Sequence, residues 1–247
     1  MNEFPWLKYF EDNYQAIRDE LLTLRGQTGF QPYRGPSWIS ERKAKDGVGN
    51  ESIDSGQWNV FYLELHNMKF DYNCEKVPLT MSLIREHIPN NYHHAFFSAL
   101  TTKSHIMKHY GPTNKKLRFH LPLMGVSGSR MRVDTETRQQ QEGKAYVFDD
   151  SFEHEAWHDG DETRLILIVD FWHPDLSPVE LKFLKVLQSA KFKAEAALSE
   201  MDPDKDNFYS IIEEAKGLIQ DNEWWVVGED KPEEKKEEVV LKEVAPT

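Results

Sequence analysis

Seven short apolar runs, separated by Gly, Pro, Asn and Asp, fill the stretch from residue 92 to residue 173. The runs read HHAFFSAL, SHIMKHY, KLRFHLPL, RMRVD, KAYVFDD, EHEAW and RLILIVDFW. Each run has the length and the turn-forming boundaries of a strand rather than those of a helix. Short strands that recur about every ten residues are typical of all-β sandwiches and barrels. The spacing therefore predicts a mainly β core.

Helices are predicted on both sides of this core. Apolar residues recur at steps of four and three through residues 4–25, which predicts an amphipathic helix that ends at Gly26. A short helix is predicted over 78–88. Two more helices are predicted within 178–220, and the first begins with Pro178 at a position where proline favours a helix start.

The chain is predicted to form one domain over residues 1–227. Its β core spans about 58–175 and begins with the alternating strand at 57–65. An irregular connection rich in Gly, Pro and Ser, residues 27–57, precedes that strand. The final segment, 228–247, is charged and lacks aromatic residues, so we expect a mobile tail there.

Charge and composition narrow the class of function. The formal net charge is −12, and nucleic-acid binding needs a concentrated basic face instead. The single cysteine, Cys74, excludes an intrachain disulfide and a zinc-finger scaffold. No run of 18 apolar residues occurs, so no membrane partner is expected. The first residues, MNEFPWLKYFEDNYQ, lack the apolar core of a signal peptide, which predicts a cytoplasmic location.

Five of the ten histidines lie on or near the predicted strands, namely His105, His109, His120, His154 and His158. A single histidine on a strand is usually structural or surface-exposed. Several in one β domain also suit a metal site, since imidazole is the commonest transition-metal ligand. Both interpretations stay open at this point.

The run KKLRFHL carries an unusual pattern of charge. Because side chains alternate along a strand, Lys116, Arg118 and His120 share one face. One interpretation is a solvated face on a half-exposed sheet. The other is a cationic wall inside a pocket that holds a dicarboxylate through charge-assisted hydrogen bonds.

The segment 148–174 brings acids, a histidine and an arginine into one predicted hairpin. Asp149 and Asp150 precede His154, and Arg164 opens an otherwise apolar strand. A hairpin of this size can place His154 near Arg164. A metal ligand beside an arginine is what binding an anionic cosubstrate to a metal would require.

Three motifs in this order resemble the aspartyl/asparaginyl β-hydroxylase family. They are HYGPTNKKLRFHLPL at 109–123, GKAYVFDDSFEHEAW at 143–157 and RLILIVDFWHPDL at 164–176. The resemblance is dense over 92–178 and weaker over 4–65. It implies a dioxygenase that depends on iron(II) and 2-oxoglutarate. It also implies a double-stranded β-helix of the jelly-roll or cupin-like kind, flanked by N- and C-terminal helices.

The resemblance implies that His109 and His154 are the two iron ligands. Most proteins with this β-helix use an H-x-D/E…H triad, but Gly111 occupies the carboxylate's position here. Water is therefore expected in the third position, as in the family. Four neighbouring acids are alternatives for the third ligand, namely Asp149, Asp150, Glu153 and Glu155, but a structural role in the hairpin is favoured for all of them. Asp149 or Asp150 is the candidate to orient a ligand imidazole.

The cosubstrate site follows from the same resemblance. Arg164 and Ser98 are expected to hold the distal carboxylate of 2-oxoglutarate. Arg118 and His120 are expected to hold its metal-proximal end or the adjoining substrate carboxylate. Trp58 stands where the family has a tryptophan near the cosubstrate.

Lys116 and Arg118 are expected to anchor an acidic substrate so that its β-carbon faces the oxidant. Arg118, His109 and His154 form the expected catalytic set. The implied reaction consumes O2, hydroxylates an unactivated carbon, and releases succinate and CO2. The expected substrate is an aspartyl or asparaginyl residue of an acidic peptide, or a related acidic small molecule.

Two other functions remain open from the sequence. One is a non-catalytic β-helix that binds a metal or a dicarboxylate, or docks a partner protein. The other is a cupin-like zinc enzyme, which the set Ser98, Arg118 and Arg164 disfavours because it suits a 2-oxo dicarboxylate. The sequence does not indicate the oligomeric state.

Overall fold

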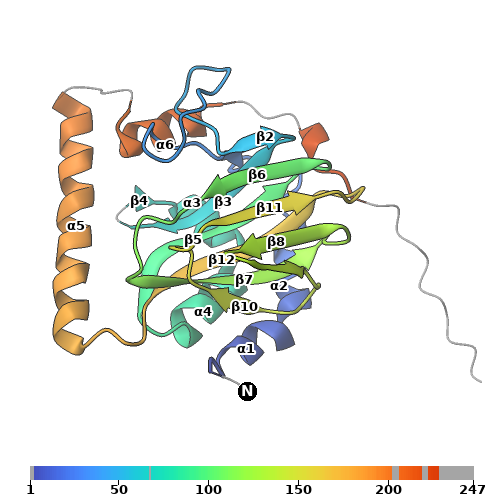
Figure 1. Cartoon of the computed structure of the whole chain (residues 1–247), viewed down its shortest axis with the longest axis horizontal. Helices are drawn as coiled ribbons and strands as arrows, with labels where there is room; N and C mark the ends of the chain where they lie inside the picture. Colours follow the sequence, from blue (N-terminus) through green and yellow to red (C-terminus); the bar gives the residue numbers. More distant parts are fainter. Residues whose placement is uncertain (1–2, 67, 202–205, 219–221, 228–247) are drawn as a thin grey trace, which may run out of the picture.

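Two antiparallel β-sheets face each other in the computed structural model, which describes residues 3–66, 68–201, 206–218 and 222–227 (Figure 1). The larger sheet has the strand order β1-β3-β5-β12-β7-β10, and β4 pairs with β3 outside this path. Its strands are β1 (Gln31–Pro32), β3 (Trp58–Leu65), β4 (Met68–Lys69), β5 (Asn91–Leu100), β7 (Lys116–Met124), β10 (Tyr146–Phe148) and β12 (Arg164–Trp172).

The smaller sheet has the order β2-β6-β11-β8-β9. Its strands are β2 (Ile53–Ser55), β6 (Ser104–His109), β8 (Ser129–Val133), β9 (Glu136–Gln139) and β11 (His154–His158). The chain passes between the two sheets several times from β2 to β12, which is the path of a double-stranded β-helix. The predicted fold class, a mainly β jelly roll with flanking helices, is confirmed.

The apolar run RLILIVDFW forms strand β12, which lies in the interior of the larger sheet. All nine of its residues are buried, and it pairs with β5 on one side and β7 on the other. Leu165 and Leu167 pack into a core with the N-terminal helices, whereas Ile166 and Ile168 pack toward the smaller sheet. Because side chains alternate, one strand supplies both cores.

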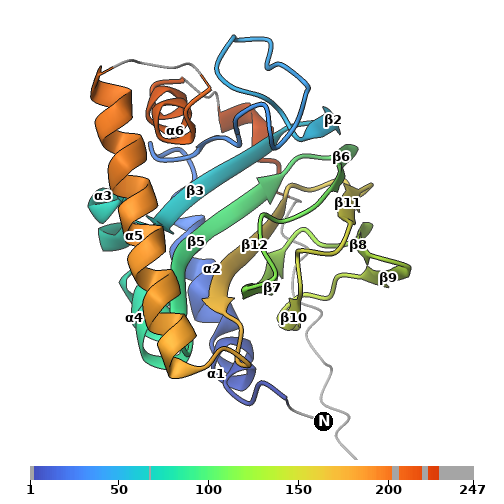
Figure 2. The same cartoon turned by 60° about the vertical axis from the view of Figure 1, so that its left-hand side comes forward.

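The N-terminal segment forms two helices, α1 (Leu7–Asp12) and α2 (Tyr14–Leu22), so the prediction of one helix over 4–25 is wrong in this detail. The break falls at Asn13, whose side-chain amide donates to the carbonyl of Tyr9 at 2.8 Å. Asparagine readily binds nearby backbone groups and so ends helices. Both helices pack against the outer face of the larger sheet (Figure 2).

Helices α3 (Asp71–Lys76) and α4 (Pro78–His87) lie between β4 and β5. The helix predicted over 78–88 is confirmed, and α3 was not predicted. Glu20 of α2 accepts hydrogen bonds from the backbone N–H groups of Leu79 and Thr80 at 2.7 and 2.8 Å. A carboxylate at a helix N-terminus satisfies free N–H groups and suits the helix dipole.

The C-terminal region contains α5 (Pro178–Met201), α6 (Phe208–Lys216) and a short 3-10 helix, η1 (Asn222–Trp224). Asn207 caps α6, because its side chain accepts from the N–H groups of Tyr209 and Ser210. Trp225 is fully buried, and the hydroxyl of Thr163 donates to the carbonyl of Trp224 at 2.7 Å. The end of the described chain is therefore docked on the core.

Within the described ranges, no helix is long and apolar enough to cross a membrane. The predicted tail over 228–247 and the end of the predicted helical region, residues 219–220, lie outside the described residues.

Candidate active site

His109 and His154 lie side by side in the smaller sheet. His109 ends β6 and His154 begins β11, and the antiparallel register pairs the two residues directly. Their ring centroids are 4.1 Å apart at an interplanar angle of 53°. Strand pairing thus brings together the two histidines that the sequence places in different motifs.

The two imidazole rings have the same orientation relative to the backbone. Nδ1 of His109 lies 2.7 Å from the carbonyl oxygen of Met107, and Nδ1 of His154 lies 2.8 Å from that of Phe152. A carbonyl only accepts hydrogen bonds, so each Nδ1 carries the proton and each Nε2 keeps its lone pair. Metal-binding histidines are commonly held in this way. The prediction that Asp149 or Asp150 orients a ligand ring is therefore wrong.

Burial keeps both rings uncharged at neutral pH. It lowers the pKa of His154 to about 3, with the neighbouring His109 adding to the effect. Burial also lowers the pKa of His109. A neutral imidazole is the form that binds a metal, so the pair needs no deprotonation before binding.

The carboxylate of Asp150 stands where a side chain on residue 111 would begin. A Cβ built on Gly111 would lie 2.5 Å from Cγ of Asp150 and 2.6 Å from each of its oxygens. Oδ1 of Asp150 is buried and has no hydrogen-bond partner. In the described part of the chain, no third His, Cys, Asp or Glu joins the histidine pair as a metal-binding group. The donors fit a two-histidine metal site with an unused carboxylate oxygen close to Gly111.

A second polar group lies on the inner face of the larger sheet. The register places Trp58, Leu100 and Arg164 in one row across β3, β5 and β12. Ser98, two residues before Leu100, points to the same side. Its hydroxyl accepts from Nη2 of Arg164 at 2.9 Å and from Nε1 of Trp58 at 3.0 Å.

Arg164 is buried without an acidic partner. It is 2% exposed, and no ion pair with any described carboxylate reaches it. Burial lowers the pKa of its guanidinium to about 10, and its Nε is buried without a hydrogen-bond partner. A buried, unpaired cation is unfavourable unless an anion joins it. Arg164, Ser98 and Trp58 therefore fit the carboxylate of a bound dicarboxylate.

His120 lies one strand further along the same inner face. Its Nδ1 is 2.9 Å from the hydroxyl of Tyr146 on β10, and its Nε2 is buried without a partner. Burial holds the pKa of His120 well below the usual value. Phe148 contacts both His120 and His154, with ring centroids 5.0 and 5.6 Å away. This phenyl ring therefore links the histidine pair to His120.

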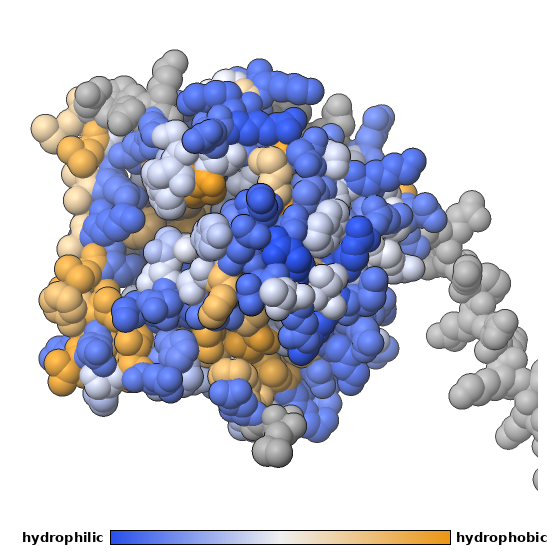
Figure 3. Space-filling model, in the orientation of Figure 1, coloured by the Kyte–Doolittle hydropathy of each residue, from blue (hydrophilic) through white to orange (hydrophobic). Residues whose placement is uncertain are grey.

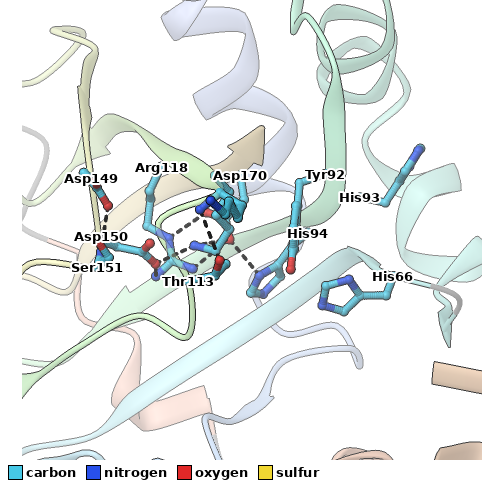
Figure 4. A network of polar contacts seen from close by, with 12 residues as sticks. His66, Tyr92, His93, His94, Thr113, Arg118, Asp149, Asp150, Ser151 and Asp170 are labelled. Atoms are coloured by element: carbon cyan, nitrogen blue, oxygen red, sulfur yellow. Dashed lines mark hydrogen bonds and ion pairs between the residues drawn. The ribbon is translucent and has the colours of Figure 1, made fainter. Parts of the chain in front are cut away.

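Arg118, Asp150 and Asp170 form a network of ion pairs (Figure 4). Lys116 belongs to the same network. Nζ of Lys116 is 2.5 Å from Asp150 and 3.0 Å from Asp170, and the side chain of Lys116 is 2% exposed. Arg118 binds Asp170 through Nε and Nη2 at 2.7 and 2.9 Å, and Asp150 lies 3.4 Å from Nη1. The carboxylates of Asp150 and Asp170 balance the charge of the two cations. The expected roles of Lys116 and Arg118 in binding cosubstrate and substrate stay predictions.

Asp170, Tyr146 and His94 are the main site residues that the sequence did not single out. Asp170 pairs across the sheet with Arg118 and with His94, whose Nδ1 is 3.0 Å from Oδ2 of the aspartate. The sequence did contain one indication that Asp170 belongs to the site. It is a lone carboxylate in an apolar strand, in the same alternation as Arg164.

A cavity of about 700 Å³ opens next to His109 of the histidine pair. His109, Gly111, Lys116, Arg118 and Asp150 line its polar end. The other walls come from β3, β5, β12, α5, α6 and the connection between β1 and β2. This volume is in the usual range for a small-molecule site.

The family model for aspartyl/asparaginyl beta-hydroxylase matches residues 11–174. The aspartyl/asparaginyl beta-hydroxylase of Mus musculus is 33% identical over 73% of this chain and 23% of its own length. The aspartate beta-hydroxylase domain-containing protein 2 of Homo sapiens is 35% identical over 72% and 47%. The ornithine lipid ester-linked acyl 2-hydroxylase of Rhizobium tropici is 36% identical over 71% and 60%.

Among solved structures, one described as a predicted oxalate decarboxylase from Thermotoga maritima has a TM-score of 0.36 at 14% identity. It covers 58% of this chain and 94% of that one. The chain spans less than two thirds of the length of each of the three relatives named above. The family match nevertheless includes every residue of the two polar groups, from Trp58 to Arg164. The chain belongs to the aspartyl/asparaginyl beta-hydroxylase family, a family of hydroxylases.

Proposed function

We propose that this protein is an iron(II)- and 2-oxoglutarate-dependent dioxygenase that hydroxylates an unactivated carbon and releases succinate and CO2. One observation carries the proposal. Two neutral histidines with free Nε2 atoms lie in the same β-helix as Arg164, a buried cation without an acidic partner. A metal with a bound dicarboxylate would satisfy both groups together.

Each residue has a role under this proposal. His109 and His154 would hold iron(II) through Nε2, and the backbone carbonyls that accept from Nδ1 keep both rings in place. Arg164, supported by Ser98, would hold the distal carboxylate of 2-oxoglutarate. Iron(II), when bound, supplies the redox chemistry that activates O2. The chain supplies orientation, charge and exclusion of water.

Two substrate classes appear in the names of the relatives, an aspartyl or asparaginyl side chain and a lipid acyl chain. The family resemblance implied an acidic substrate, and Lys116 and Arg118 were expected to anchor it. That expectation assumed free positive charge, whereas both cations are paired with Asp150 and Asp170. Lys116 and Arg118 are therefore not free cations for an acidic substrate.

Succinate formation from 2-oxoglutarate with iron(II), ascorbate and O2 tests the proposal. We expect succinate with the unaltered chain and none with His154→Ala. His105→Ala is the matched control, because His105 lies on β6 but pairs with Asp54 and Glu155 away from the histidine pair. Binding of 2-oxoglutarate without succinate under all conditions would favour a non-catalytic binding protein. The absence of any binding would refute the cosubstrate assignment.

A further inference from the structure

Four polar side chains form a connected chain of hydrogen bonds between the two sheets. Hydrophilic side chains dominate the outer face of the smaller sheet (Figure 3), whereas mostly apolar side chains fill the space behind it. The exceptions, which we call the polar relay, are Ser129 on β8, Gln140 after β9, Tyr146 on β10 and His120 on β7. Tyr146 is half-buried and the other three are buried, so their polar atoms need partners in the protein or in a ligand.

The hydrogen bonds of the polar relay have a direction. The hydroxyl of Ser129 donates to Oε1 of Gln140 at 2.6 Å, which leaves the amide nitrogen to face Tyr146. That nitrogen donates to the hydroxyl oxygen of Tyr146 at 2.7 Å. An amide nitrogen only donates, so the Tyr146 oxygen accepts here and its own proton is directed to another acceptor.

The proton of the Tyr146 hydroxyl has two acceptors within reach. Nδ1 of His120 lies 2.9 Å from the hydroxyl oxygen, and Sδ of Met131 lies 3.7 Å from it. Thioether sulfur is a weak acceptor, so the closer imidazole nitrogen takes the proton. Burial raises the pKa of Tyr146 to about 12, and the phenol therefore keeps this proton at neutral pH. Nδ1 of His120 is thus an acceptor.

His120 must then carry its own proton on Nε2. The ring is neutral because burial holds the pKa of His120 well below its usual value, and the charges of Arg118 and Arg164 add to the effect. A neutral imidazole has one donor and one acceptor nitrogen. Nε2 of His120 is buried and has no hydrogen-bond partner in the described part of the chain. A buried donor without an acceptor is unfavourable, so this N–H fits an oxygen atom of a ligand.

This tautomer is the opposite of the one in the histidine pair. His109 and His154 carry the proton on Nδ1 because backbone carbonyls accept it, and each keeps the Nε2 lone pair that a metal needs. In His120 the hydroxyl of Tyr146 replaces the carbonyl and reverses the arrangement. The partner of Nδ1 therefore divides these three histidines into two that can bind a metal through Nε2 and one that donates from it.

We propose that Tyr146 is a positioning residue that holds His120 in the Nε2–H form, so that His120 donates to a ligand oxygen instead of binding the metal. Arg164 on the same inner face is the candidate for the distal carboxylate, which leaves the metal-proximal oxygens of the dicarboxylate for His120. The identity of this ligand rests on the proposed function. The tautomer of His120 does not.

Long-range ¹H–¹⁵N spectra of the full chain without added metal or ligand test the tautomer directly, because protonated and unprotonated ring nitrogens resonate far apart. Signals that disappear in His120→Gln assign the ring. We expect a proton on Nε2 in the unaltered chain and a mixture of both tautomers in Tyr146→Phe, which keeps the aromatic ring and removes the hydroxyl. A proton on Nδ1 of His120 in the unaltered chain, or an unchanged tautomer in Tyr146→Phe, would overturn the inference.

Calorimetric titration of 2-oxoglutarate with iron(II) under anaerobic conditions tests the consequence for binding. We expect about a fivefold weaker affinity in Tyr146→Phe, which is the effect of one weakened hydrogen bond. Tyr14→Phe is the matched control, since Tyr14 is also half-buried but packs beside Gly143 in the core on the outer side of the larger sheet. Its tautomer of His120 and its affinity should equal those of the unaltered chain.

Two further results would contradict the inference. One is an equal loss of affinity in Tyr146→Phe and Tyr14→Phe, and the other is a changed tautomer with unchanged affinity. Failure of the unaltered chain to bind 2-oxoglutarate would instead refute the proposed function. The spectra would still report the tautomer of His120 in that case, so the two failures are distinguishable.

Discussion

Arg118 on β7 and Asp170 on β12 lie directly opposite each other and share two hydrogen bonds, at 2.7 and 2.9 Å. Lys116 contacts the same carboxylate at 3.0 Å, and Nδ1 of His94 lies 3.0 Å from it on the other side. Asp170 is therefore the common partner of Lys116, Arg118 and His94. Two of the three cations that the sequence suggested for ligands, Lys116 and Arg118, are bound to this residue, whereas Arg164 is not.

Replacement of Asp170 by asparagine should destabilise the fold strongly. It leaves Lys116 and Arg118 with one carboxylate, and breaking a buried ion pair costs about 3–5 kcal/mol. Urea unfolding measures the change. Asp175→Asn should have no effect, because the side chain of Asp175 is 89% exposed. Equal stabilities of the two variants would show that the network does not support the fold.

Arg164→Met should abolish tight binding of 2-oxoglutarate without loss of stability. The substitution removes a buried cation that has no acidic partner, so the free energy of unfolding should stay equal or rise. Calorimetric titration with iron(II) under anaerobic conditions should show at least a tenfold weaker affinity. Arg130→Met, at the partly exposed pair with Asp159, is the control. Unchanged affinity would mean that another cation holds the distal carboxylate.

His109→Ala and His154→Ala should each remove iron binding and succinate formation. Each variant leaves one imidazole, and no other described His, Cys, Asp or Glu completes the site. Equilibrium dialysis with iron(II) measures the binding directly, with His105→Ala as the control. Retention of stoichiometric iron by either variant would remove that residue from the ligand set.

Gly111→Ala should disturb the site although the added group is small. The new Cβ would lie 2.5 Å from the carboxyl carbon of Asp150, so the Asp150 side chain, which pairs with Lys116, would have to shift. Overpacking of this kind costs about 1–3 kcal/mol. A double-mutant cycle with Asp150→Ala checks the cause. If the two effects on the free energy of unfolding simply add, the close approach is not the reason for the loss.

The free energy of unfolding should fall as the pH drops below 6.5, in part through His66. Burial, with a smaller effect of His94, lowers the pKa of His66 to about 2, so only the unfolded chain gains a proton between these values. This stabilisation is complete above pH 6.5 and decreases below it. From pH 7.5 to pH 5 the loss from this residue is about 2 kcal/mol.

The variant His66→Asn provides the comparison. Asparagine tolerates the positive φ of 54° at this position and does not titrate. The stability difference between the two proteins, from chemical denaturation at both pH values, should shrink on acidification by the amount given above. A difference that does not change with pH would show that His66 titrates normally in the folded protein.

The β core was readable from the sequence because strand signals are local. Alternation in KLRFHL and the apolar run RLILIVDFW predicted strands that β7 and β12 confirm. The break at Asn13 was missed because one side-chain hydrogen bond decides it, and apolar periodicity does not register such a bond. Helix α3 was missed for a similar reason, since six residues contain too little periodicity to detect.

The candidate site, like the fold, was predicted from the sequence only in part. The motifs around His109, His154 and Arg164 name the groups expected to carry chemistry, because residue type limits what each can bind. Their pairing partners come from strands far apart in the sequence, and no local pattern specifies them. Alternation correctly put Lys116 and Arg118 on one face, but it could not show that Asp170 would lie opposite.

By itself, the sequence determined a mainly β core and, through its motifs, a resemblance to the family that implied the double-stranded β-helix and the metal- and cosubstrate-binding candidates. Periodicity and residue chemistry are properties of the chain that tertiary contacts do not alter. Only the tertiary structure decided which charges are free. It paired Lys116 and Arg118 with Asp150 and Asp170, left Arg164 without an acid, and set α5 beside the cavity. Charge balance and desolvation depend on neighbours in space, and strand register determines those neighbours.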